Sequence, residues 1–219
     1  MVDLIRGLTA ERVAANLAQV RERIAAAGRD PDDVEILAAV KYLPATELQA
    51  LADGGITIVG ENRAQELVAK AAAAPGSFIW DFIGQLQSRK VRDLVPHVRY
   101  IHSVSTDSAL TQLERYGTPD TQVLVEVNVA GEPGKGGIEP SQLDDFIARC
   151  PVTVVGLMTM PPLTSRAQDS RPHFAQLRRL AERHQLPHLS MGTSQDYVAA
   201  VQEGATIVRL GTILYRGAP

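Results

Sequence analysis

Apolar, β-branched segments recur along the chain and predict eight strands. They cover residues 34–40, 56–60, 78–83, 98–102, 122–129, 152–157, 188–191 and 206–210. Most of these segments are apolar at nearly every position, which is typical of parallel strands covered by helices on both faces. The pattern therefore favours an α/β fold with a parallel sheet.

Helical patterns separate the strands. The first helix, residues 9–27, precedes all of them, with Thr9 as a candidate cap and Gly28 at its end. The helix expected from residue 62 opens with a capping-box spacing of Asn62 and Gln65. Further helices are predicted over residues 46–53, 62–73, 87–95, 107–116, 141–149, 165–184 and 194–203.

Strict alternation of strand and helix predicts right-handed crossovers, in an open doubly wound sheet or a closed barrel. Eight strands favour a (β/α)8 TIM barrel. The sequence ends nine residues after Leu210, too few for a full eighth helix, so we expect the N-terminal helix to cover that part of the wall. No Pro/Gly/Ser-rich linker divides residues 1–219, which predicts one domain with no C-terminal β domain.

Composition narrows the class of protein. The 219 residues are 45% hydrophobic and 21% charged, with a net charge of −3, which excludes disorder and gives no electrostatic reason to expect nucleic acid as a partner. A single cysteine, Cys150, cannot form an internal disulfide and is typical of a reducing compartment. No signal peptide or membrane span is evident. We therefore expect a cytoplasmic protein that does not bind membranes.

Lys41 is the first candidate for chemistry, because active sites of such barrels lie at the C-terminal ends of the strands. It follows the apolar residues 36–40, where its ammonium would lose part of its hydration and become a better amine nucleophile toward an aldehyde. A lysine that simply extends into solvent is the alternative. Other strand-end candidates are Glu61, Asn62, His102 and Glu126.

The last two strands end in small and hydroxylated residues. The seventh strand ends in the segment from Ser190 to Ser194, and Gly211 and Thr212 follow the eighth strand. Loops at these two places often bind phosphate in barrels of this kind, through backbone N–H groups and hydroxyls. Arg209 shares a face with Gly211 by the two-residue period and should point into the mouth. Ordinary helix capping by serine and threonine is the alternative.

Two further patterns give weaker signals. His184 and His188 have the spacing of a helical metal pair, but Pro187 breaks the helix between them, and we expect no metal site. Residues 131–137 are rich in glycine but lack the Gly-Lys-Ser/Thr ending of a P-loop. They predict a mobile flap, in which Lys135 could reach a ligand.

A short motif lies at each of the eight strand ends. The motifs, in order, are Ala39-Val40-Lys41, Gly60-Glu61-Asn62, Phe82-Ile83-Gly84, Ile101-His102-Ser103, Val127-Asn128-Val129, Gly156-Leu157-Met158, Leu189-Ser190-Met191-Gly192 and Val208-Arg209-Leu210-Gly211-Thr212. Together they resemble the motifs of the pyridoxal phosphate homeostasis protein family, also called the YggS or PROSC family, and the resemblance covers nearly the full length. The sequence departs from the family pattern at Gln85, Arg89, Gly136 and Thr193.

The resemblance implies a single barrel similar to the N-terminal domain of alanine racemase, with pyridoxal 5'-phosphate as cofactor. It implies that Lys41 holds the cofactor as a Schiff base, that Asn62 lines the pocket and that Arg209 faces the pyridine nitrogen. The residues expected around the phosphate are Ser190, Gly192, Thr193, Ser194, Gly211 and Thr212.

An arginine at the pyridine nitrogen disfavours protonation there and weakens the ring as an electron sink. We therefore expect a non-catalytic or barely catalytic protein of vitamin B6 and amino-acid homeostasis. We take it as a monomer, with pyridoxal phosphate-dependent apoenzymes as candidate partners. A pyridoxal phosphate-dependent amino-acid racemase is the alternative. A Schiff-base aldolase acting on a phosphorylated sugar is a third hypothesis, disfavoured because such enzymes commonly carry their lysine on the sixth strand, where this chain has Met158.

Overall fold

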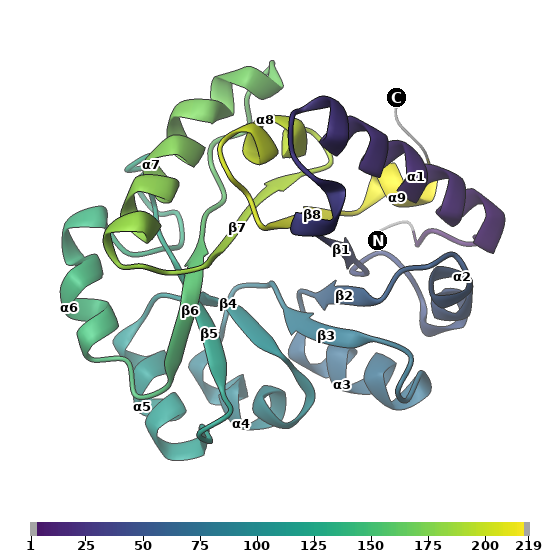
Figure 1. The fold of residues 1–219 in the computed structure, drawn as a ribbon. Helices are drawn as coiled ribbons and strands as arrows, with labels where there is room; N and C mark the ends of the chain where they lie inside the picture. Colours follow the sequence, from purple (N-terminus) through teal and green to yellow (C-terminus); the bar gives the residue numbers. More distant parts are fainter. Residues whose placement is uncertain (1–3, 217–219) are drawn as a thin grey trace.

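The computed structural model describes residues 4–216, which form a closed barrel of eight parallel strands surrounded by helices (Figure 1). The predicted fold is thereby confirmed. Each strand pairs with its neighbours in the sequence, and β8 closes the barrel on β1: Leu37 lies beside Ile58 on one side and Arg209 on the other. The strands are β1 (Glu35–Ala39), β2 (Ile58–Glu61), β3 (Ile79–Phe82), β4 (Tyr100–Val104), β5 (Gln122–Glu126), β6 (Thr153–Met158), β7 (His188–Thr193) and β8 (Ile207–Leu210).

Helices follow the strands and form the outer layer. They are α1 (Ala10–Ala26), α2 (Leu48–Asp53), α3 (Ala64–Ala73), α4 (Val91–Leu94), α5 (Asp107–Tyr116), α6 (Leu143–Ala148), α7 (Arg171–Arg183), α8 (Tyr197–Gln202) and α9 (Thr212–Arg216).

The N-terminal helix fills the expected gap in this layer. Helix α1 contacts α8, α9 and α2, and so lies where a full eighth helix would otherwise close the wall (Figure 1). Its apolar face is buried, including Val13, Val20 and Ile24, and the Thr9 side chain accepts a hydrogen bond from the N–H of Arg12. The predicted cap is thus confirmed.

Several local predictions were wrong; for example, the strand expected over residues 122–129 ends at Glu126. Helix α3 begins at Ala64 with Arg63 as its N-cap, and the expected capping box of Asn62 and Gln65 does not form. Instead Glu61 Oε1 accepts the N–H groups of both Asn62 and Arg63, because the last residue of β2 turns its carboxylate toward the start of the helix. Strand β4 also extends to Val104, which places His102 in the middle of a strand.

The interior of the barrel is only partly apolar. One cluster of buried side chains fills part of it, namely Leu37, Tyr100, Leu124, Met158 and Ile207. Branched aliphatic residues normally fill the whole interior of such barrels. In this chain Asp81, His102, Ser190 and Arg209 are also buried, each 6% exposed or less. A buried polar side chain is costly unless it has partners, so these four residues must bond to one another or to the backbone.

Candidate functional site

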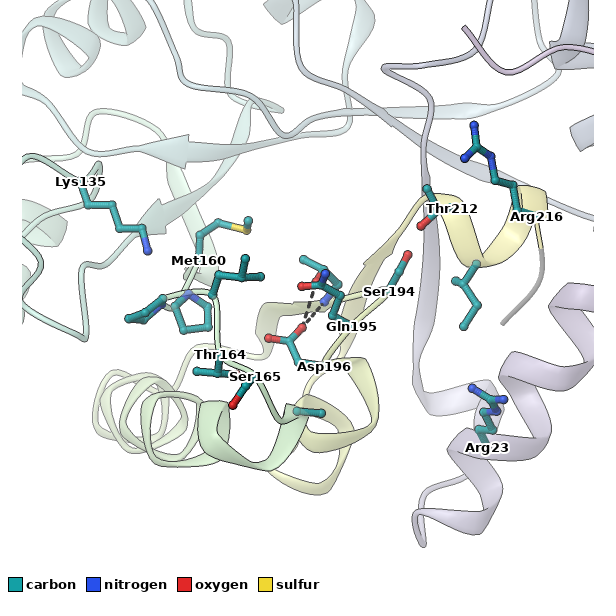
Figure 2. A pocket seen from close by; sticks show the side chains of 16 residues that line it. Arg23, Lys135, Met160, Thr164, Ser165, Ser194, Gln195, Asp196, Thr212 and Arg216 are labelled. Atoms are coloured by element: carbon teal, nitrogen blue, oxygen red, sulfur yellow. Dashed lines mark hydrogen bonds between the residues drawn. The ribbon is translucent and has the colours of Figure 1, made fainter. Parts of the chain in front are cut away.

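A cavity of about 890 Å³ opens at the C-terminal end of the barrel, beside the loops that follow β6, β7 and β8. Thr193, Ser194 and Thr212 line it, as the sequence predicted for a phosphate site. In the view of Figure 2, Ser194 and Thr212 lie on neighbouring segments, with Lys135 at one end of the cavity and Arg216 at the other. Lys135 also pairs with the carboxylate of Glu132 within its own loop.

The turn after β7 is tightly built. Gly192 has a φ of +91°, and a Cβ at this position would lie 2.6 Å from the Cβ of Ala200, so glycine lets the turn pack on α8. The N–H and hydroxyl of Thr193 both donate to Asp196 Oδ1, at 2.7 and 3.0 Å. The Ser194 hydroxyl accepts the N–H of Gly211 at 3.1 Å, which joins the turn after β7 to the end of β8.

These two turns and the start of α9 have the composition of an anion site. Backbone N–H groups at a helix start and nearby hydroxyls are the donors that bind phosphate in such barrels. The Thr193 hydroxyl already donates its proton to the Asp196 carboxylate. The hydroxyls of Ser194 and Thr212 are therefore better placed to donate to an anion. The predicted phosphate residues are therefore brought together, with the exception of Ser190.

Ser190 lies inside the barrel and is fully buried. Its hydroxyl is 2.9 Å from His102 Nδ1 and accepts a hydrogen bond of 2.6 Å from Arg209 Nη1. Ser190 lies within β7 and contacts the interior, whereas Ser194 follows the last residue of the strand, Thr193, and lines the cavity.

Lys41 and Asn62 lie in a different place. They line a second cavity of about 740 Å³, beside the ends of β1 and β2. The Lys41 side chain is exposed, so the expected loss of hydration is not found, and its ammonium lies 4.6 Å from the centroid of the Tyr42 ring. The Asn62 Oδ1 is buried and has no hydrogen-bond partner within residues 4–216, which leaves an acceptor open to a ligand.

The backbone just before Lys41 is held by two long-range donors. Lys70 Nζ donates to the carbonyl of Val40 at 2.8 Å, and the Tyr215 hydroxyl donates to the carbonyl of Ala39 at 3.0 Å. Lys70 also pairs with Glu61 at 2.6 Å, and both side chains are 5% exposed or less. Lys70 is not among the site residues predicted from the sequence. Its helical position gave no signal, since a lysine on α3 would ordinarily face solvent.

Arg209 lies on β8, between the strand that leads to the first cavity and the strand that leads to Lys41. Its Nη1 donates to the carbonyl and hydroxyl of Ser190, and its Nη2 donates to the carbonyl of Thr159 and to Met160 Sδ. Burial lowers the pKa of Arg209 to about 10, although the carboxylates of Glu126 and Asp196 act in the opposite direction. The guanidinium therefore stays charged at neutral pH.

Asp81 and Arg99 extend the hydrogen bonds of Arg209, Ser190 and His102 away from the mouth. Neither residue was predicted from the sequence. Asp81 Oδ2 is 3.1 Å from His102 Nε2 and accepts a hydrogen bond of 2.6 Å from Arg99. Burial alone would raise the pKa of Asp81, but hydrogen bonds from His102 and Arg99 outweigh it and hold the pKa below its usual value. The sequence did contain a signal for Asp81, because a carboxylate between Trp80 and Phe82 interrupts an otherwise apolar strand.

Acidification is expected to destabilise the protein. Burial lowers the pKa of His102 and of His188 below the ordinary histidine value. The unfolded chain takes up these two protons from about pH 6.5 downward, whereas the folded chain does so only at lower pH. The free energy of unfolding should therefore be highest above pH 6.5 and fall below it by up to about 1.4 kcal/mol per pH unit for each histidine.

Urea unfolding at pH 7.5, 6.5 and 5.5 measures this loss. The His188→Gln variant should lose stability about half as steeply, because one of the two histidines is gone. A free energy of unfolding that stays constant over this range would show that His102 and His188 titrate in the folded protein as they do in the unfolded chain.

Within residues 4–216, no helix is long and apolar enough to cross a membrane. The same residues contain no group of three or more His, Cys, Asp or Glu side chains arranged to hold a metal ion.

The chain is similar to a known family of proteins. Residues 8–219 match the family described as "Alanine racemase, N-terminal domain". The chain is 38% identical to the pyridoxal phosphate homeostasis protein of Aquifex aeolicus, over 94% of this chain and 96% of that protein. It is 33% identical to the protein of the same name from Escherichia coli K12, over 93% and 95% of the two chains.

Solved structures agree in fold. The structure of PipY from Synechococcus elongatus "with PLP bound" is 32% identical, with a TM-score of 0.78 over 93% of this chain and 99% of PipY. Alanine racemase from Corynebacterium glutamicum is 13% identical, with a TM-score of 0.73 over 97% of this chain and 62% of the racemase, and shows the fold alone. The matched family, the identities and the coverage together show that the chain belongs to the pyridoxal phosphate homeostasis protein family, built on the fold of the alanine racemase N-terminal domain.

Proposed function

We propose that this chain binds pyridoxal 5'-phosphate as a Schiff base on Lys41, with little or no catalysis, and serves vitamin B6 and amino-acid homeostasis. One observation carries the proposal: the neighbouring strands β7, β8 and β1 bring close together a turn rich in hydroxyl and backbone N–H donors after β7, Arg209 on β8 and Lys41 just after β1. Pyridoxal phosphate presents a phosphate, a pyridine nitrogen and an aldehyde, and each of these groups has a suitable partner in that set.

The residues fit the cofactor chemically. Ser194, Thr212 and the backbone of the β7 and β8 turns, including Gly192 and Gly211, would hold the phosphate. Arg209 would face the pyridine nitrogen, and Asn62 offers an unpartnered acceptor near Lys41. When bound, the cofactor supplies an aldehyde that condenses with an amine. The family membership and the PLP-bound structure of PipY support this assignment.

Lys41 must turn away from Tyr42 to meet a cofactor at Arg209. The side chain is exposed, and its contact with the ring is a cation–π interaction at 4.6 Å. Such a contact at an exposed site contributes about 0.5–1 kcal/mol. The change of rotamer therefore costs little, and the backbone that carries it stays fixed by Lys70 and Tyr215.

Arg209 and Tyr215 argue for a binding protein rather than an enzyme. A charged guanidinium beside the pyridine nitrogen disfavours the protonated ring that stabilises carbanions. The Tyr215 hydroxyl donates to the carbonyl of Ala39 and is buried, so it is not available as an acid or base. We infer a monomer that holds the cofactor and releases it to pyridoxal phosphate-dependent apoenzymes.

An absorption spectrum of the purified protein with added pyridoxal phosphate tests the proposal. A visible band that borohydride removes, with a reduced pyridoxyl group mapped to Lys41 by peptide mass spectrometry, is the expected result. Incubation with enantiopure amino acids should leave their optical purity unchanged, whereas racemisation would favour the enzyme alternative. Absence of any band at saturating cofactor would overturn the proposal.

A further inference from the structure

A continuous chain of polar side chains crosses the barrel interior from Arg209 at the mouth to Glu35 at the opposite end. Arg209 Nη1 donates to Ser190 Oγ at 2.6 Å, and Ser190 Oγ lies 2.9 Å from His102 Nδ1. His102 Nε2 lies 3.1 Å from Asp81 Oδ2. Arg99 then binds Asp81 and donates to both carboxylate oxygens of Glu35, at 2.9 and 2.8 Å.

Arg209 at one end and Asp81 at the other fix the direction of every hydrogen bond between them. An arginine can only donate, and an ionised carboxylate can only accept. Asp81 therefore requires a proton on His102 Nε2. Burial keeps His102 neutral, so its Nδ1 is an acceptor and takes the hydroxyl proton of Ser190. The Ser190 oxygen is then free to accept from Arg209.

This arrangement determines which donors Arg209 has left. Its four hydrogen bonds all come from the two Nη atoms, and none comes from Nε among the partners in residues 4–216. The remaining N–H on Nε is the donor available to a ligand. The Ser190 hydroxyl directs its proton to His102 Nδ1, so its lone pairs face Arg209 Nη1. The direction of this hydrogen bond therefore depends on Asp81, which fixes the proton of His102 two residues further along the chain of contacts, while the backbone carbonyls of Ser190 and Thr159 accept the other Nη donors.

We propose that Asp81 and His102 are positioning residues: acting through Ser190, they orient the Arg209 guanidinium so that its Nε–H is presented to the ligand at the barrel mouth. The identity of that ligand as pyridoxal phosphate rests on the proposed function. The positioning itself belongs to the protein without any ligand and can be measured there.

Groups from each neighbouring element that face His102 are consistent with this role. Asp81 comes from β3, Ser190 from β7 and Arg209 from β8, while Arg99 lies just before β4 and acts on His102 through space. The Tyr100 ring lies 6.2 Å from the His102 ring, and its hydroxyl bonds to His188 at 3.3 Å, outside the chain. Tyr100→Phe is therefore a matched control that removes a hydrogen bond from the same interior.

The variant Asp81→Asn tests the proposal, because its amide can donate where the carboxylate could only accept. In the protein without cofactor, nitrogen NMR of His102 should show the proton on Nε2, and Asp81→Asn should move it to Nδ1. The Arg209 Nη hydrogens should give separate resonances in the unmodified protein and in Tyr100→Phe, and averaged resonances in Asp81→Asn. Ser190→Ala should average them too, with His102 keeping its Nε2 proton, and serves if Asp81→Asn does not fold.

With cofactor, Asp81→Asn and Ser190→Ala should each weaken equilibrium binding of pyridoxal phosphate about tenfold, the effect expected for one misdirected charge-assisted hydrogen bond, and Tyr100→Phe should not. A proton on Nδ1 of the unmodified protein, or Arg209 resonances that do not differ among the variants, would overturn the positioning. If the unmodified protein binds no cofactor while the NMR results are as expected, the proposed function fails and the positioning stands.

Discussion

Replacing Lys41 by alanine is expected to prevent covalent attachment of pyridoxal phosphate. After borohydride reduction, the number of pyridoxyl groups per chain should fall from about one to none. The cofactor aldehyde needs a primary amine at the mouth. Lys41 is the lysine that follows β1, beside the strand that carries Arg209. The other lysine on the second cavity, Lys70, is buried and bonded to Glu61 and Val40, so it cannot substitute. Mass spectrometry of the reduced protein measures the attachment.

A matched control is Lys90→Ala, which removes a lysine that pairs with Asp93 on the surface, away from both cavities. Its pyridoxyl group should remain at one per chain. An adduct that persists in Lys41→Ala and maps to another lysine would contradict the assignment. Phosphate binding without covalent attachment should survive in Lys41→Ala, because the turns after β7 and β8 are unchanged.

The Lys70→Met variant is expected to lose about 3–5 kcal/mol of unfolding free energy, the typical cost of removing one partner from a buried ion pair. Lys70 and Glu61 are 5% and 1% exposed, and their oxygen–nitrogen distance is 2.6 Å. Without Lys70, the Glu61 carboxylate is buried beside the Val40 carbonyl, which also loses its donor. Methionine fills much of the same volume, so the loss reflects charge and hydrogen bonding rather than packing. Urea unfolding measures it.

The double variant Glu61→Gln/Lys70→Met separates these causes. Because both charges are then removed, it should recover a large part of the lost stability. Lys90→Met, which breaks a partly exposed pair with Asp93, should cost less than about 1 kcal/mol. A Lys70→Met variant as stable as Lys90→Met would show that Glu61 is solvated or protonated when its partner is absent.

Much of the fold could be predicted from the sequence, because each strand and helix is encoded locally. The apolar segments lie at the observed strands, and the α1 helix with its Thr9 cap forms as expected. The boundaries were less certain: the pattern ended the fourth strand at His102, whereas β4 continues through two more residues to Val104. The polar Ser103 interrupts the apolar pattern, so the strand was predicted to end before it. Ser103 is nevertheless buried, because its hydroxyl donates to the carbonyl of Gly84.

The candidate site was predictable in part. Position after a strand identified Lys41, Asn62, Ser194 and Thr212 as residues of the mouth, and the structure places each on a cavity there. Position alone could not separate the two cavities. It also could not show that the Ser190 hydroxyl accepts a hydrogen bond from Arg209. The two residues are 19 positions apart, on β7 and β8, and meet only because of the stagger of the strands in the barrel.

The sequence by itself determined the order of strands and helices, the closed barrel and the family, since these follow from local periodicity and from motifs at the strand ends. Only the tertiary structure decided what fills the barrel. His102 and Ser190 are 88 residues apart and meet across the interior, with Asp81 and Arg209 beside them. Which interior side chains share a layer depends on the register of all eight strands, and closure of the sheet sets that register.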